Sequence, residues 1–128
     1  MPVQYVIDKG RRLVITTASG RVTFAESKAH QERIRNDPDF HPDFNQFLDA
    51  TSVTALDISS EEARTLARNS PHFSASSRRA WLAPNAFLFG MGRMIGIYRE
   101  MAGGEEQFRV FNDREQALQW LGLDALSP

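Results

Sequence analysis

The sequence contains no cysteine. Disulfide bonds, thiolate nucleophiles and cysteine-ligated zinc or iron–sulfur centres are therefore excluded. A chain of 128 residues does not need such crosslinks, because a domain of this length buries roughly two-thirds of the surface that its unfolded chain exposes. We therefore expect one domain over 1–128, built around an ordinary hydrophobic core.

Long apolar runs and an excess of one charge are also missing. The most apolar stretch, 80–97, is interrupted by Pro84, Asn85 and Arg93, which makes it too polar to span a bilayer. Lys and Arg number 15 against 16 Asp and Glu, so nothing attracts the chain to nucleic acid or anionic lipid in general. The N-terminus has no basic segment before an apolar core. We therefore expect a cytoplasmic protein with no membrane span and no nucleic-acid partner.

Motifs for catalysis and metal binding are absent as well. His30, His41 and His72 have no zinc-binding spacing, and we expect His30 at a half-exposed position on a helix surface. The acidic loop 37–44 lacks the glycine and the closing glutamate of a calcium loop. We therefore predict no enzyme, no metal and no cofactor. The weaker alternative is an enzyme that uses polar groups at strand ends, namely Asp49, His72, Arg78 and Arg93.

Alternating β-rich and helical segments predict an α/β fold. An N-terminal β-hairpin is followed by βαβ units, which imply a mainly parallel sheet. Two capping boxes, Thr23 with Glu26 and Ser59 with Glu62, mark helix starts. The expected strands are 3–7, 13–17, 21–23, 45–50, 79–83 and 108–111, with a turn at 53–56. The expected helices are 24–36, 59–70, 85–101 and one that begins after Asn112 or Asp113.

Glycines at 90, 92 and 96 interrupt the third of these helices and approximate a dinucleotide-binding fingerprint. The fingerprint needs its glycines in the turn that leaves a strand. Here an apolar stripe of helical spacing runs through them. We therefore favour the interpretation that small residues let the helix pack closely on the sheet.

The order of several short segments resembles the SpoIIAA-like, or STAS/CRAL-TRIO-like, bacterial domains over nearly the whole chain. The segments are Gly20–Thr23, Asp37–Phe40, Phe47–Asp49, Arg79–Ala83, Phe89–Met94, Phe108–Phe111 and Ala117–Leu121. The resemblance implies a sheet with helices mostly on one face. It also implies a non-enzymatic regulatory or interaction module. The alternative that it offers, from CRAL-TRIO domains, is a carrier of a small apolar or lipid-like ligand.

In the antagonist members of that group, a serine at a helix start is phosphorylated within a motif that resembles Asp-Ser-Ser-Gly. The nearest match here is Asp57-Ile58-Ser59-Ser60, where Ile58 intervenes and Glu61 replaces the glycine. Ser59 and Ser60 are therefore candidates for a phospho-switch. The simpler interpretation, which we favour, is that Ser59 only caps the helix.

Two further groups of residues are candidate binding sites. Adaptable methionine and aromatic side chains of the third helix are a candidate ligand pocket, unless they are ordinary core: Phe87, Phe89, Met91, Met94 and Met101. Hydroxyl and guanidinium groups before the strand 79–83 are a candidate anion site, unless the segment is an ordinary loop: Ser76, Ser77, Arg78 and Arg79.

We also predict a homodimer. The edge strand 3–7 is apolar and nearly uncharged, which leaves it open to pairing. The apolar stripe of the helix 85–101 is wider than one sheet face can cover, so part of it should reach solvent in a monomer. In the alternative arrangement, the last helix covers this surface within one chain.

Overall fold

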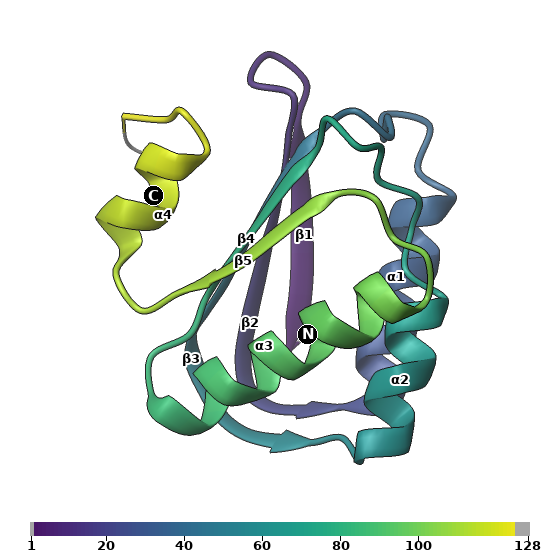
Figure 1. Ribbon diagram of the computed structural model, residues 1–128, viewed down its shortest axis with the longest axis vertical. Helices are drawn as coiled ribbons and strands as arrows, with labels where there is room; N and C mark the ends of the chain where they lie inside the picture. The colour runs from purple at the N-terminus through teal and green to yellow at the C-terminus, as the bar shows by residue number, and fades with distance from the viewer. Residues whose placement is uncertain (1, 125–128) are drawn as a thin grey trace.

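A mixed sheet organises the chain in the computed structural model, which describes residues 2–124 (Figure 1). The strand order is β1-β2-β3-β4-β5, with β1 antiparallel to β2 and all later neighbours parallel. The α/β class, the N-terminal hairpin and the mainly parallel sheet are therefore confirmed. In chain order the elements are β1 (Val3–Asp8), β2 (Leu13–Thr23), α1 (Phe24–Arg35), β3 (Asn45–Asp57), α2 (Ser60–Arg68), β4 (Arg78–Leu82), α3 (Ala86–Met101), β5 (Gln107–Phe111) and α4 (Arg114–Trp120).

The helix starts follow the local chemistry of the sequence. The side chains of Thr23 and Ser59 each accept a hydrogen bond from the backbone N–H of a glutamate three residues later. The carboxylate of that glutamate accepts a hydrogen bond from the backbone N–H of the cap residue, so both predicted capping boxes are confirmed. Asn85 caps α3 through its side-chain oxygen, which accepts from the Leu88 backbone N–H at 3.0 Å. These bonds satisfy donors that every helix leaves free in its first turn.

The strand β3 is longer than predicted, and the predicted turn at 53–56 is wrong. Val53 and Leu56 belong to the strand, where they pair with Gly20 and Val22 of β2. The polar residues between them concealed the strand in the sequence. Gly20 likewise does not end β2, because its φ of +63° absorbs a register shift within one continuous strand.

Alternation along the strands gives the sheet two different faces. Leu13, Phe47 and Phe111 point to the face that α4 covers, and they form a buried apolar cluster with it. The helices α1, α2 and α3 cover the other face, and Figure 1 shows α4 standing apart from them. Three helices on one face agree with the predicted arrangement. The last helix therefore does not cover the apolar stripe of α3.

The glycines of α3 permit close packing on β5, as predicted. A Cβ atom at Gly92 would lie 3.1 Å from the Val110 side chain, and one at Gly96 would lie 2.8 Å from Phe108. These glycines lie within a helix rather than in a turn that leaves a strand, so they do not form a dinucleotide site. No helix within residues 2–124 combines the length and apolarity that a membrane crossing requires.

Candidate functional site

A pocket of about 130 Å³ lies between the sheet and the helices α1, α2 and α3. Most of its lining is apolar and comes from all of these elements, including Val22, Leu48, Leu56, Leu66, Met91 and Ile95. An engineered cavity of about 150 Å³ with a similar apolar lining binds benzene. The pocket therefore has room for the apolar part of a small organic molecule.

The long ends of β2 and β3 form one rim of this pocket. Ala18 and Val22 are buried there beside Val3 of β1, and the half-buried Val53, Leu56 and Ile58 pack against them. The two strands curve together toward α1 and α2, the helices that follow them (Figure 1). The part of β3 that was missed in the sequence therefore supplies much of the pocket wall.

Arg79 of β4 also lines this pocket, although only 5% of the residue is exposed. Its Nε donates to Oε1 of Gln46 at 2.9 Å, and its Nη1 donates to Ser70 Oγ at 3.1 Å and to Glu106 Oε2 at 2.9 Å. The guanidinium carbon lies 4.4 Å from the ring centre of Phe73. Burial lowers the pKa of Arg79 to about 10, which still leaves it charged at neutral pH.

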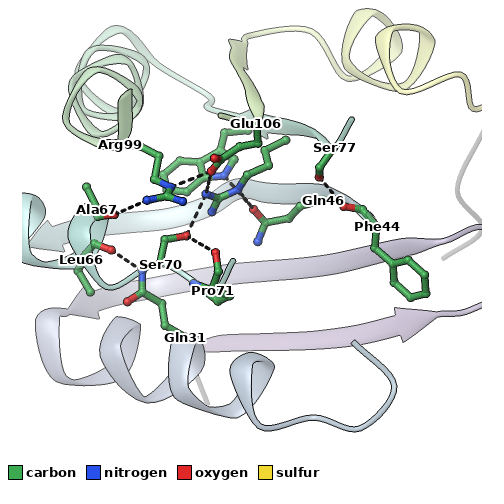
Figure 2. A network of polar contacts seen from close by, with 12 residues as sticks. Gln31, Phe44, Gln46, Leu66, Ala67, Ser70, Pro71, Ser77, Arg99 and Glu106 are labelled. Atoms are coloured by element: carbon green, nitrogen blue, oxygen red, sulfur yellow. Dashed lines mark hydrogen bonds and ion pairs between the residues drawn. The ribbon is translucent and has the colours of Figure 1, made fainter. Parts of the chain in front are cut away.

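Glu106 connects Arg79 to a second arginine. Arg99 of α3 donates from Nε to the same oxygen, Oε2, at 2.9 Å, and from Nη1 to the Ala67 carbonyl at 3.3 Å. The Glu106 side chain has no exposed surface. Burial alone would raise its pKa, but the two guanidinium groups outweigh burial and hold the pKa below its ordinary value. Figure 2 shows Glu106, Arg99, Ser70 and Gln46 drawn together between the sheet and the helices.

A chain of polar groups continues from Gln46 to His30. Gln46 Nε2 donates to Thr16 Oγ1 at 3.4 Å, and Thr16 Oγ1 lies 3.0 Å from Nε2 of His30. Since the Gln46 oxygen already accepts from Arg79, its amide nitrogen must face Thr16. The Thr16 hydroxyl therefore links the Gln46 amide to the imidazole ring of His30.

The predicted half-exposed position of His30 is wrong, because only 6% of the residue is exposed. Burial, together with the nearby positive charges of Arg33 and Arg79, lowers its pKa to about 4. His30 is therefore neutral at pH 7. A helix position with modest periodicity gave no sign that it faced a polar strand residue.

The structure does not bring the predicted ligand residues of α3 together. Met91 lines the pocket, whereas Phe87 and Met101 are 63% and 78% exposed. Phe89 borders a separate depression beside β5, and Met94 is half-buried outside the pocket. The pocket-facing positions come from several elements rather than from one helical stripe.

The four residues of the predicted anion site do not meet at one place either. Ser76 lies near Asp43, and the buried Ser77 donates to the Phe44 carbonyl. Arg78 and Arg79 are consecutive in β4 and therefore point to opposite faces. Arg78 donates to the Trp120 carbonyl at 2.7 Å on the α4 side, and only Arg79 reaches the pocket.

Ser59 and Ser60 are exposed at the start of α2. Ser59 Oγ accepts from the Glu62 backbone N–H at 3.1 Å, which is its capping role. The polar groups at the strand ends do not converge, because Asp49 forms an ion pair with Arg114 while His72 and Arg93 are exposed elsewhere. In residues 2–124 no group of three or more acidic or histidine side chains is arranged to hold a metal ion.

These features define an α/β module of SpoIIAA-like fold with an apolar pocket and a buried polar network on one face of its sheet. One similar solved structure is the crystal structure of an uncharacterised protein of the DUF3478 family from Shewanella loihica PV-4, described as having a SpoIIAA-like fold. The two chains share 16% identity over 93% of each, with a TM-score of 0.61. At this identity the likeness shows the fold alone. No family model and no curated protein matches the sequence.

Proposed function

We propose that this protein is a binding module that holds a small apolar or amphipathic molecule between its sheet and the helices α1–α3. The observation that carries the proposal is the pocket of about 130 Å³. Protein interiors are close-packed, with few voids larger than a water molecule. A largely apolar pocket of this size therefore costs stability that an occupant would restore.

The polar groups of the pocket favour binding over catalysis. Glu106 is held by two arginines, and its pKa lies below the ordinary value. The pKa of His30 is about 4. A general acid or base works best with a pKa near the working pH, and neither group meets that condition at pH 7.

Filling the pocket tests the proposal. Ala50 of β3 lines the pocket, and Ala50→Leu would occupy part of its volume. Ala55, on the same strand, is exposed, so Ala55→Leu is a matched control. We expect 1-hexanol, titrated by calorimetry, to bind the wild type and the control and to bind Ala50→Leu at least tenfold more weakly. Equal binding to all three, or no binding to the wild type, contradicts the proposal.

Self-association is a second proposal, favoured by the exposed stripe of α3. Phe87, Ile97 and Met101 are 63%, 55% and 78% exposed. With Gly90 and Met94 they repeat at steps of three and four residues, the spacing of a helix–helix contact. Closed two-fold dimers are the commonest soluble assemblies.

Light scattering tests the homodimer. We expect twice the 14.5 kDa of one chain at micromolar concentration. Ile97→Glu should return the protein to a folded monomer, whereas Arg93→Glu, on an exposed part of the same helix, should not. A single-chain mass that persists after tenfold concentration contradicts this proposal.

The phospho-switch at Ser59 or Ser60 also stays a prediction. A phosphate there would meet the positive end of the α2 dipole, but Glu61 and Glu62 in the first turn would repel it. Phosphopeptide mapping after growth in the native cells checks this version of a regulatory role. An unmodified pair of serines removes the switch and leaves the ligand proposal intact.

A further inference from the structure

One wall of the pocket carries more positive charge than its own residues balance. Arg79 and Arg99 share the carboxylate of Glu106, and neither forms an ion pair with any other carboxylate in residues 2–124. The side chains of the two arginines are only 7% and 13% exposed. An unpaired charge is costly in such surroundings. Arg79, Arg99 and Glu106 together carry a net charge of +1.

One nitrogen of the Arg79 guanidinium group also has no hydrogen-bond partner within residues 2–124. Its Nε and Nη1 have partners, but Nη2 donates to no residue in the part of the chain that the structure describes. The guanidinium group is held in place by Phe73 and Phe108, whose ring centres lie 4.4 Å and 5.4 Å from its central carbon. A guanidinium group that is fixed in this way is suited to bind a carboxylate oxygen.

His30 offers a second polar atom to the same pocket. Its Nε2 lies against Thr16, and its Nδ1 forms no hydrogen bond within residues 2–124. In the tautomer that carries the proton on Nδ1, this atom can donate to an occupant. His30 and Arg79 both line the pocket. Within residues 2–124 the one buried side-chain polar atom without a partner is Oε1 of Glu106, so Arg79 Nη2 and this nitrogen of His30 retain accessible surface. Because both residues line the pocket, an acceptor on the occupant can satisfy them.

We propose that the occupant is a small monocarboxylate, whose anionic group binds at Arg79 and whose apolar part fills the space between Leu48, Leu56 and Met91. This inference rests on the proposed function. The cluster carries a surplus of one positive charge, which one carboxylate neutralises. A phosphate monoester carries about −1.5 to −2 at pH 7, and the excess would repel Glu106. The volume of about 130 Å³ suits an apolar part of five or six carbons, by comparison with benzene in about 150 Å³.

Two probes of matched chain length test the charge, with calorimetry on the whole chain at pH 7. We expect hexanoate to bind at least tenfold more tightly than 1-hexanol. If the two bind equally, the carboxylate inference is overturned and the binding function stands. If neither binds, the proposed function fails and this inference fails with it. Hexyl phosphate binding more tightly than hexanoate overturns the choice of a monocarboxylate.

Variants of the cluster give shifts of opposite sign. Arg79→Gln should bring the preference for hexanoate over 1-hexanol close to one, while Arg93→Gln, a control at an exposed arginine of α3, should leave it unchanged. Arg99→Gln makes the cluster neutral and should lower the preference. Glu106→Gln raises its charge by one unit and should increase the preference. Shifts of the same sign in the last two variants overturn the inference, even if Arg79→Gln does not fold.

Discussion

The two faces of the sheet solve the same packing problem differently. On the α4 face, inward positions of four strands are apolar and close against Ala117, Leu118 and Leu121. On the α1–α3 face, three of these strands present Thr16, Gln46 and Arg79, all of which are buried. Buried polar groups must be satisfied by one another, which constrains packing and leaves room for a pocket. The α4 face therefore stabilises the domain mainly through apolar packing, whereas the α1–α3 face keeps the pocket in which the proposed ligand would bind.

The largest effect expected from this comparison concerns neighbouring residues of β3. Phe47 is 1% exposed on the α4 face, and Phe47→Ala should lower the free energy of unfolding by about 4 kcal/mol through lost burial and a new cavity. Leu48 is half-buried on the pocket wall, so Leu48→Ala should cost about 1–2 kcal/mol. Urea denaturation measures both. Equal costs would remove the distinction between the two faces.

Neutralising the carboxylate on the pocket face should have the next largest effect. Glu106→Gln keeps the shape of the side chain but leaves two buried guanidinium groups without an anion, which should cost about 3 kcal/mol. Glu105 is exposed, and Glu105→Gln should change stability by less than about 0.5 kcal/mol. Thermal and urea unfolding compare the pair. A small loss in Glu106→Gln would show that the cluster contributes little to the stability of this face.

A pH dependence should follow from His30. Its pKa is about 4 in the folded chain and 6.5 ordinarily, so the unfolded chain binds more protons between these values. Its contribution is complete above about pH 6.5 and is lost as the pH falls toward 4, by up to roughly 3 kcal/mol. The pKa values of Asp49 and Glu106 are also lowered, but these carboxylates change the stability only below the ordinary carboxyl pKa near pH 4.

The variant His30→Gln isolates this effect. Glutamine can still form a hydrogen bond with Thr16 but does not titrate. We expect its stability to fall less than that of the wild type between pH 6.5 and pH 4.5, as measured by urea unfolding at each pH. Parallel pH profiles for the two proteins would contradict the assignment of this loss to His30.

The smallest effects concern how α3 sits on the pocket face. A Cβ atom at Gly90 meets nothing within 4 Å, so Gly90→Ala should stabilise the helix by about 0.5–1 kcal/mol. At Gly96 the same atom would lie 2.8 Å from Phe108, which must move, and Gly96→Ala should cost roughly 1 kcal/mol. Differential scanning calorimetry resolves the two. Stabilisation by both would mean that α3 is seated loosely enough to shift.

The sequence predicted what depends on local chemistry. Capping boxes at Thr23 and Ser59 defined helix starts, and the glycines of α3 predicted its close packing on β5. The end of β3 was missed, because Thr51, Ser52 and Thr54 interrupt its alternation and its partner in β2 lies 30 or more residues earlier. Pairing between distant strands leaves little signal in either strand alone.

The pocket could not be predicted because its parts lie on separate elements. His30, Gln46, Arg79, Arg99 and Glu106 are ordinary residues where they stand in the sequence, and only the fold makes them neighbours. One signal was present. Arg79 directly precedes the apolar run Ala80-Trp81-Leu82 in a strand of a mainly parallel sheet, where both faces are usually buried. A charged residue at such a position indicates a buried partner, although not which one.

The unequal lengths of the strands have a consequence for the motions of the chain. In β3, residues 46–49 pair with β2 on one side and β4 on the other, whereas the later residues of the strand pair with β2. Two-stranded ribbons are marginally stable without further support, so the far half of β3 should open and close more often than the near half. Amide hydrogens of this one strand should therefore exchange slowly in the centre of the sheet and faster at the rim of the pocket. An occupant could enter past the faster half while the slower half stayed intact.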